Sequence, residues 1–251
     1  MQACAADTQE KEIIRGYINH YAKNMHDKHG RLIFKTLNDG CIEHEKRLHS
    51  MMSNVTTVSF NREHGTVAEI KSKLRHELKD VYKTRAFSEV ADINHHLIAS
   101  SYASKEATPT YIWFDYPSFI SDGTNPNKTT WGSFIDAVGI ASRFDSVSNS
   151  EFAVTFSCHP RCLRERFKSF FGNDAYQRCS YPHVTDYSKT TGRCKAEEIA
   201  RFQVETMNKE FRKQGWRCKQ SFFYQNGRSY MMTACFDREN LAPNKKIKIL
   251  N

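Results

Sequence analysis

The hydrophobic positions of the chain alternate between short β-rich runs and stretches with helical spacing. A stripe that includes Ile14 and Ile18 predicts an amphipathic helix over residues 8–26. Strands are predicted at 31–37, 54–60, 85–92, 110–115 and 151–157, and helices between or after them at 41–52, 66–79, 93–100, 131–144, 160–171 and 196–214. Strands that alternate with helices in this way predict a parallel sheet with right-handed crossovers.

Two stretches complete the predicted sheet. Residues 110–115 form a continuous apolar run that stops at Asp115, which predicts a buried strand with helices over both faces. Near the C-terminus, Asn226-Gly227 lies between the β-rich runs 216–224 and 229–236, and Asn-Gly in this position predicts a hairpin. We therefore expect an α/β fold: a mostly parallel sheet with a C-terminal antiparallel hairpin and helices on both faces.

The length of 251 residues suits one large domain with a full core. We expect an N-terminal helical extension over residues 1–30, a main domain over 31–240 and a basic tail over 241–251. No apolar run is long enough to span a bilayer, and the polar first residues do not match a secretory leader. The expectation is a soluble intracellular protein, cytoplasmic or nuclear, without a membrane partner.

The balance of charge bears on the partner. Lysine and arginine number 37 against 28 aspartates and glutamates, which gives a net charge of +9. This favours a polyanion such as RNA or DNA, although many basic proteins bind no nucleic acid. The preferred contact surface has Arg161, Arg164 and Lys168, after the fifth strand. A second basic run, residues 71–85, includes acids of its own and also suits an ordinary solvated helix face.

Eight cysteines are too few for a disulfide scaffold in a chain of this length. Four of them, Cys158, Cys162, Cys179 and Cys194, with neighbouring histidines, offer enough soft ligands for zinc. Their spacing matches no zinc motif known to us. Buried reduced thiols are therefore the favoured interpretation, and no metal site is predicted.

The order of elements resembles that of the class I S-adenosylmethionine-dependent methyltransferases. The resemblance covers roughly residues 31–238. It rests on a turn at 38–40 after the first strand, an acid, an aromatic residue and a proline after the fourth, and the final hairpin. It implies a Rossmann-like methyltransferase sheet with S-adenosylmethionine as cofactor. A single glycine in the first turn disfavours NAD or FAD.

The resemblance also implies cofactor residues. Asn38, Asp39 and Gly40 would contact the methionine end, Asn61 or Glu63 the ribose hydroxyls, and Asp92 with Ile93 the adenine. The sequence departs from the family pattern, because the turn has one glycine and the acid after the second strand is displaced to Glu63. For Glu63, a solvated acid at the start of a helix is an equally good interpretation.

The segment Asp115-Tyr116-Pro117-Ser118-Phe119 is distantly similar to motifs of nucleobase amino-methyltransferases and of tRNA guanine dimethyltransferases. The resemblance implies that Asp115 and the Pro117 carbonyl accept amine hydrogens and that Tyr116 or Phe119 stacks on the base. Two alternatives stay open: Asp115 caps the structure that follows it, and Phe119 packs in the core.

The predicted function is S-adenosylmethionine-dependent methylation of a nucleobase amino group in RNA or DNA. Two alternatives are a methyltransferase-like subunit without catalysis that binds nucleic acid or a protein partner, and a methyltransferase acting on protein or a small molecule. The predicted methylation function requires the turn at 38–40 and Asp115 to lie at the same edge of one sheet.

Overall fold

A computed structural model describes residues 9–38, 40–91, 109–115, 150–158, 189–213, 215–227, 229–238 and 248–249. Several predictions fall outside these residues. They are the helices at 93–100, 131–144 and 160–171, the site residues Asp39, Asp92, Ile93, Tyr116, Pro117, Phe119, Arg161, Arg164 and Lys168, and the cysteines Cys162 and Cys179.

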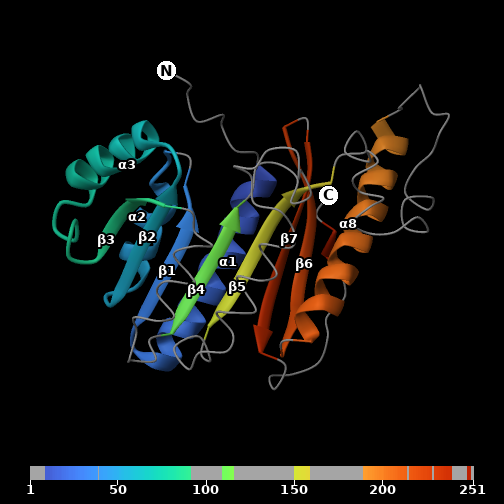
Figure 1. The fold of residues 1–251 in the computed structure, drawn as a ribbon, viewed down its shortest axis with the longest axis horizontal. Helices are drawn as coiled ribbons and strands as arrows, with labels where there is room; N and C mark the ends of the chain where they lie inside the picture. The colour runs from blue at the N-terminus through green and yellow to red at the C-terminus, as the bar shows by residue number, and fades with distance from the viewer. Residues whose placement is uncertain are drawn as a thin grey trace. The chain divides into compact units, whose positions relative to one another are not determined.

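The described residues fall into two compact units. The first contains the chain up to Asp115 together with the start of strand β5. Its elements are α1 (Gln9–His29), β1 (Leu32–Leu37), α2 (Glu43–Met51), β2 (Val55–Asn61), α3 (His64–Glu77), β3 (Ala86–Val90) and β4 (Thr110–Asp115) (Figure 1). Each strand and helix predicted among the described residues of this region is confirmed within a few residues.

Helix α1 follows directly from its sequence pattern. Ile14, Ile18, Ala22 and Met25 recur at helical spacing and are all buried. Acidic residues stand in its first turn and basic residues in its last, where each sign suits the helix dipole. Gly30 follows at a φ of 71° and donates its backbone N–H to the His26 carbonyl, which ends the helix.

The strands of the first unit follow the order β3-β2-β1-β4, and every pair among them is parallel. Phe34 of β1 packs on His44 of α2, Ser59 of β2 bonds Glu45 of α2, and Ala86 of β3 packs against α3. The register of the strands places these three positions on one face of the sheet. Both crossovers therefore cover the same face of the sheet.

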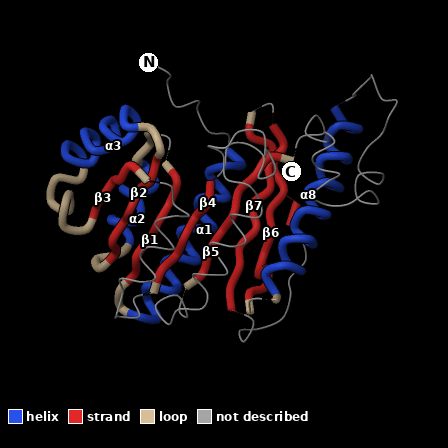
Figure 2. Tube along the Cα trace, viewed as in Figure 1, coloured by secondary structure: helices blue, strands red, loops and turns tan. Residues whose placement is uncertain are grey.

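The second unit contains the rest of β5 and the chain that follows. Its elements are β5 (Glu151–Ser157), α8 (Lys189–Arg212), β6 (Trp216–Asn226), β7 (Ser229–Arg238) and β8 (Lys248–Ile249). Their strand order is β5-β7-β6-β8, and β6 and β7 form the predicted antiparallel hairpin (Figure 2). Gly227 closes it at a φ of 60°.

Two features of this unit differ from the predictions. Helix α8 begins at Lys189 rather than at residue 196. Strand β8 lies in the segment expected to be a basic tail, where Lys248 and Ile249 pair in parallel with Phe222 and Phe223 of β6.

The predicted fold class is confirmed: a Rossmann-like mixed sheet with helices, parallel in its first strands and antiparallel at the C-terminal hairpin. Among the described residues, no helix is both long and apolar enough to cross a membrane. The same residues contain no cluster of three histidine, cysteine or acidic side chains placed to hold a metal ion. Cys158, one of the four cysteines weighed as zinc ligands, has a buried side chain.

Candidate functional site: a polar rim at the ends of β1, β2 and β4

Polar residues end three neighbouring parallel strands. Leu37 of β1 is level with Phe60 of β2, and Thr36 is level with Trp113 of β4. Continuing this register brings Asn38, Asn61 and Asp115 out at the same edge. The turn at 38–40 and Asp115 thus share one rim, as the predicted function requires.

This rim lies where the strand order of the sheet reverses. The chain moves from β1 outward to β2 and β3, and then returns to place β4 on the other side of β1. Connections therefore leave β1 and β4 in opposite directions. Ligands of open α/β sheets bind beyond the carboxyl ends of the strands at such a switch point.

The Asn38 side chain is fully used in shaping its own turn. Its Oδ1 accepts the Gly40 backbone N–H at 2.7 Å, while its Nδ2 donates to the Cys41 carbonyl at 2.9 Å and to Glu45 Oε1 at 2.7 Å. Such side-chain to backbone bonds mimic a backbone turn. The amide group of Asn38, a residue predicted to contact the cofactor, holds the turn in place.

Gly40 adopts a φ of 111°, which residues with a side chain rarely adopt. A Cβ built there would lie 3.6 Å from the Glu69 carboxylate. The Gly40 carbonyl accepts a hydrogen bond from Lys73 Nζ at 2.6 Å, and Lys73 also pairs with Glu69 at 2.6 Å. Helix α3 therefore fixes the turn from outside.

A buried acid fixes the turn from inside. Glu45 is only 1% exposed, and its Oε1 accepts hydrogen bonds from Asn38 at 2.7 Å and from Ser59 Oγ at 2.5 Å. Its other oxygen has no hydrogen-bond partner within the described part of the chain. Burial raises the pKa of Glu45, and the bonds from Ser59 and Asn38 only partly offset this.

Asn61 ties β2 to the turn. Its Nδ2 donates to the Asn38 carbonyl at 2.7 Å, and its Oδ1 accepts the Glu63 backbone N–H at 2.8 Å. Glu63 directly precedes α3, is exposed, and accepts a bond from Thr66 Oγ1 at 3.2 Å. This is the solvated helix-start acid of the alternative interpretation. It nevertheless leaves a solvent-facing carboxylate beside the rim.

Asp115 is held by a lysine that the sequence did not reveal. Lys11 Nζ lies 2.8 Å from one Asp115 oxygen and 2.9 Å from the other. Lys11 is 4% exposed, and its ammonium also lies 4.9 Å from the centroid of the Trp113 ring. The Asp115 side chain keeps 25% exposure, and a carboxylate has more lone pairs than Lys11 can occupy.

A signal for Lys11 was present in the helix pattern. It stands three residues before Ile14, on the same inward stripe as Ile18, and α1 packs against β1. A cation on an inward stripe must find an acid, because an unpaired buried charge is strongly destabilising. An acid at the end of a buried strand was the natural candidate.

His44 is the second residue that the sequence did not reveal. Its ring lies 4.9 Å from that of Phe34 and 5.2 Å from that of Trp113, measured between centroids. Burial, with the nearby cations Arg15, Arg47 and Lys11, lowers the pKa of His44 to about 3. Neither ring nitrogen has a hydrogen-bond partner among the described residues. His44 therefore acts as a neutral aromatic support for the rim.

The parallel strands and the antiparallel hairpin form a Rossmann-like α/β fold. Neither family models nor curated proteins match the sequence. Among solved structures, the chain is similar to a proposed rRNA methylase from Clostridium thermocellum, at a TM-score of 0.48 and 14% identity, over 92% of this chain and 98% of the other.

Two further solved structures are similar over most of the chain. One is a proposed RNA methyltransferase from Pyrococcus horikoshii, at a TM-score of 0.48 and 8% identity, over 90% of this chain and 83% of the other. The second is a magnesium protoporphyrin IX methyltransferase from Synechocystis with bound SAH, at a TM-score of 0.45 and 8% identity, over 90% and 83%. At identities this low, the roles of residues in these structures cannot be assigned to residues of this chain.

Replacing Glu45 separates its charge from its hydrogen bonds. Because its pKa is raised in the folded state, wild-type stability falls as pH rises from the unfolded pKa of 4.5 toward the folded one. Glu45→Gln keeps the acceptor oxygen, so its free energy of unfolding, from urea denaturation at pH 8, should equal or exceed that of the wild type. Glu45→Ala should cost about 1–3 kcal/mol. A large loss in Glu45→Gln would contradict this account.

Removing Lys11 should leave a partly buried carboxylate without its partner. We expect Lys11→Met to lower the free energy of unfolding by about 1–3 kcal/mol, less than for a fully buried pair because Asp115 is partly exposed. The double variant Lys11→Met/Asp115→Asn should recover much of this loss, since the unpaired charge is gone. Urea titrations of both variants test the coupling, and equal stability of the two would refute it.

His44 should make the protein sensitive to acid. Between pH 6.5 and about 3 the unfolded chain binds a proton at His44 that the folded chain does not. The free energy of unfolding therefore decreases as the pH is lowered through this window. On moving from pH 7.5 to 5, the wild type should lose about 2 kcal/mol more than His44→Phe. Denaturation at both pH values measures this difference, which a solvated histidine would not produce.

Proposed function

We propose that the chain is an S-adenosylmethionine-dependent methyltransferase whose reaction takes place at the rim of β1, β2 and β4. One observation carries the proposal. The fixed turn at Asn38 and Gly40 and the oriented carboxylate of Asp115 emerge from adjacent parallel strands, on either side of the switch point. A cofactor held by one and an acceptor held by the other would meet at this rim.

The residues at the rim suit the cofactor in different ways. Gly40 lacks a side chain in a turn locked from both sides, which permits close backbone approach by the amino-acid end of the ligand. The exposed Glu63 carboxylate is an acceptor for the ribose hydroxyls. Asn38 and Asn61 serve as scaffold. For three further residues, the proposed contact with the cofactor rests on the resemblance alone: Asp39, Asp92 and Ile93.

The bound cofactor would supply a methyl group on a positively charged sulfur. The chain's own contribution is positioning. Lys11 fixes the Asp115 carboxylate, whose remaining lone pairs would accept a hydrogen of the incoming amino group and align its nitrogen. The proposed roles of Tyr116, Pro117 and Phe119 in binding the base rest on the motif that begins at Asp115.

The substrate we propose is a nucleobase amino group in RNA or DNA. The acid, aromatic residue and proline that begin at Asp115 support this class, as does the net charge of +9. Arg161, Arg164 and Lys168 remain the proposed contacts after β5. The second candidate is a methyltransferase-like subunit without catalysis, favoured by the internal bonding of Asn38 and Asn61.

Cofactor binding can be tested by thermal stability. S-adenosylhomocysteine at about 100 times its dissociation constant should stabilise the folded chain by about 2.7 kcal/mol, a rise of roughly 5–10 °C in Tm. Gly40→Val should abolish the shift, because a side chain is strained there. Gly16→Ala is the matched control, since nothing lies within 4 Å of its Cβ position. No shift with the wild type would exclude cofactor binding.

Catalysis can be tested separately at Asp115. Asp115→Asn should lower transfer of labelled methyl groups to RNA or DNA oligonucleotides about 100-fold or more, because its amide is a weaker acceptor held less firmly by Lys11. The shift with S-adenosylhomocysteine should persist, which separates lost catalysis from lost binding. Turnover equal to that of the wild type would remove Asp115 from the mechanism.

A further inference from the structure

Four exposed cations line the end of α3 and the turn after it. They are Lys71, Arg75, Lys79 and Lys83, which we name the α3 basic stripe. Lys71 and Arg75 stand one turn apart on α3, while Lys79 and Lys83 lie in the connection to β3. None of the four forms an ion pair with another described residue.

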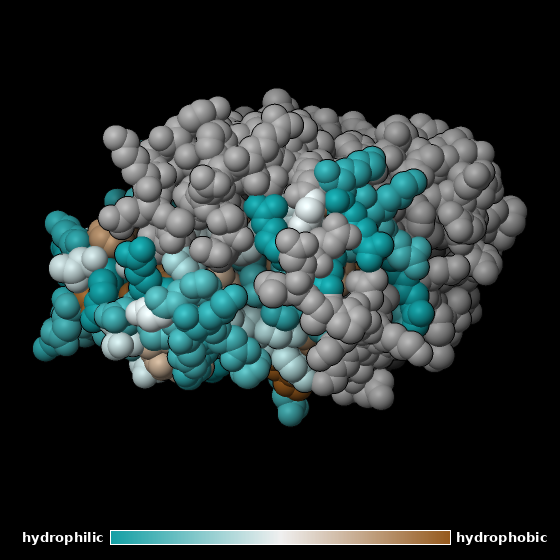
Figure 3. Space-filling view, turned by 90° about the horizontal axis from the view of Figure 1, so that it is seen from below, coloured by the Kyte–Doolittle hydropathy of each residue, from teal (hydrophilic) through white to brown (hydrophobic). Residues whose placement is uncertain are grey.

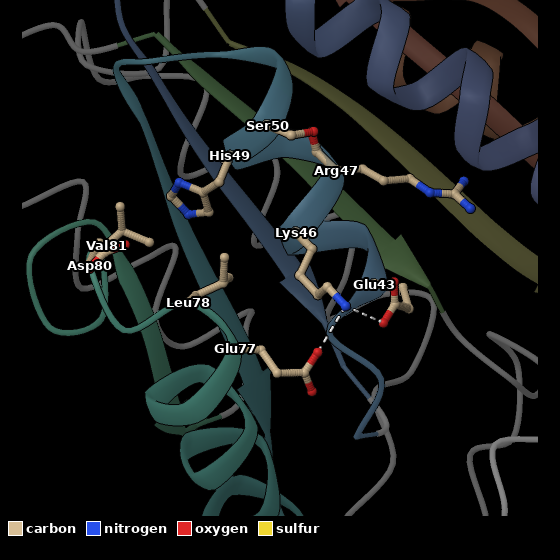
Figure 4. A pocket seen from close by; sticks show the side chains of 9 residues that line it. All are labelled: Glu43, Lys46, Arg47, His49, Ser50, Glu77, Leu78, Asp80 and Val81. Carbon is tan, nitrogen blue, oxygen red and sulfur yellow. Dashed lines mark hydrogen bonds and ion pairs between the residues drawn. The ribbon is translucent and has the colours of Figure 1, made fainter.

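Two of the three acids around the stripe are already engaged. Glu69 pairs with Lys73 at 2.6 Å, and Glu77 pairs with Lys46 of α2 at 2.8 Å. Figure 4 shows Glu77 turned toward Lys46 across an open pocket of about 510 Å³. Asp80, beside Lys79, is the remaining acid of this segment. The stripe therefore keeps a net positive charge.

Two of the four cations contact a partly buried aromatic ring. The Tyr82 ring lies 5.8 Å from the Arg75 guanidinium and 5.8 Å from Lys83 Nζ, and it packs against the cluster of Ile70, Leu74 and Ala86. Backbone bonds close the turn, including one from the Ala86 N–H to the Val81 carbonyl at 2.9 Å. Two cations are thus anchored on one partly buried ring.

Folding alone does not account for these residues. Like charges at positions i and i+4, such as Lys71 and Arg75, destabilise a helix. Lys83 has a φ of 63°, where glycine or asparagine is better tolerated than lysine. Both features work against stability, and all three residues are exposed. Such a cost at the surface points to a binding role.

The charge and surroundings indicate which partner. The described surface at the left of Figure 3, which is seen from below, is mostly hydrophilic. The large hydrophobic residues exposed in the described part are Ile13, Met51 and Val90, and none lies on α3 or in the turn after it. A membrane surface would favour apolar side chains among the cations. A phosphate backbone requires only the cations.

We propose that the α3 basic stripe binds the phosphate backbone of a nucleic acid. The proposal rests on the nucleic-acid substrate given under "Proposed function" and adds a contact surface made of none of the rim residues. Backbone contacts carry no sequence information, so the stripe should set affinity and orientation, while the rim selects the base.

The test compares two variants with equal loss of charge. One changes Lys71, Arg75, Lys79 and Lys83 to glutamine. The control changes four other exposed cations to glutamine: Lys28, Arg201, Lys209 and Arg212. Affinity for a labelled 20-nucleotide single-stranded RNA is measured by fluorescence anisotropy from 50 to 200 mM salt. The same titration with single-stranded DNA and with vesicles containing 30% phosphatidylserine distinguishes the polyanions.

The stripe variant should bind RNA and DNA about 10- to 100-fold more weakly at 100 mM salt. The negative slope of log affinity against log salt should become shallower by about two to four. The control should lose far less. Equal losses in both variants, or stripe-dependent binding to vesicles only, would overturn the proposal. The shift with S-adenosylhomocysteine should survive in both variants. If RNA binding depends on the stripe but S-adenosylhomocysteine does not shift the Tm of the wild type, the proposed phosphate contact is supported and the methyltransferase assignment is wrong.

Discussion

The ion pair between Lys11 and Asp115 is the constraint on which the arrangement of the rim depends. It joins the first helix to the end of a strand 104 residues later, and Lys11 is almost entirely out of water. A cation in such a position destabilises the fold unless an acid meets it with good geometry. The pair therefore specifies how α1 lies against the carboxyl end of β4. The exposed part of Asp115 is oriented by the same contact.

The rest of the rim separates groups that hold the turn from groups that face solvent. The side chains of Asn38, Ser59 and Asn61 and one oxygen of Glu45 bond to one another or to the backbone, and these bonds fix the turn. The groups that face solvent are the carboxylate of Glu63 and part of the Asp115 side chain. A single glycine is enough here because Lys73 of α3 and Asn38 hold the turn, work that additional glycines could not do.

The sequence predicted the elements better than the site. Strand β4 was predicted at its observed bounds, and the hairpin followed from Asn226-Gly227, because apolar periodicity and turn chemistry are local signals. The pairing of Lys11 with Asp115 and the bond between Ser59 and Glu45 join residues far apart in the chain, which no local pattern encodes. Asn38 was correctly placed at the turn, but only its hydrogen bonds revealed a structural use.

The separation between Lys11 and Asp115 also bears on synthesis at the ribosome. Helix α1 leaves the ribosome well before its acid exists, since 104 residues lie between the two partners. At about 5–20 residues per second, that interval lasts roughly 5–20 seconds. The contacts of β1, β2 and β3 with α2 and α3 involve shorter chain separations and can form first. Docking of α1 through Lys11 thus belongs to the later steps of co-translational folding, after β4 has emerged.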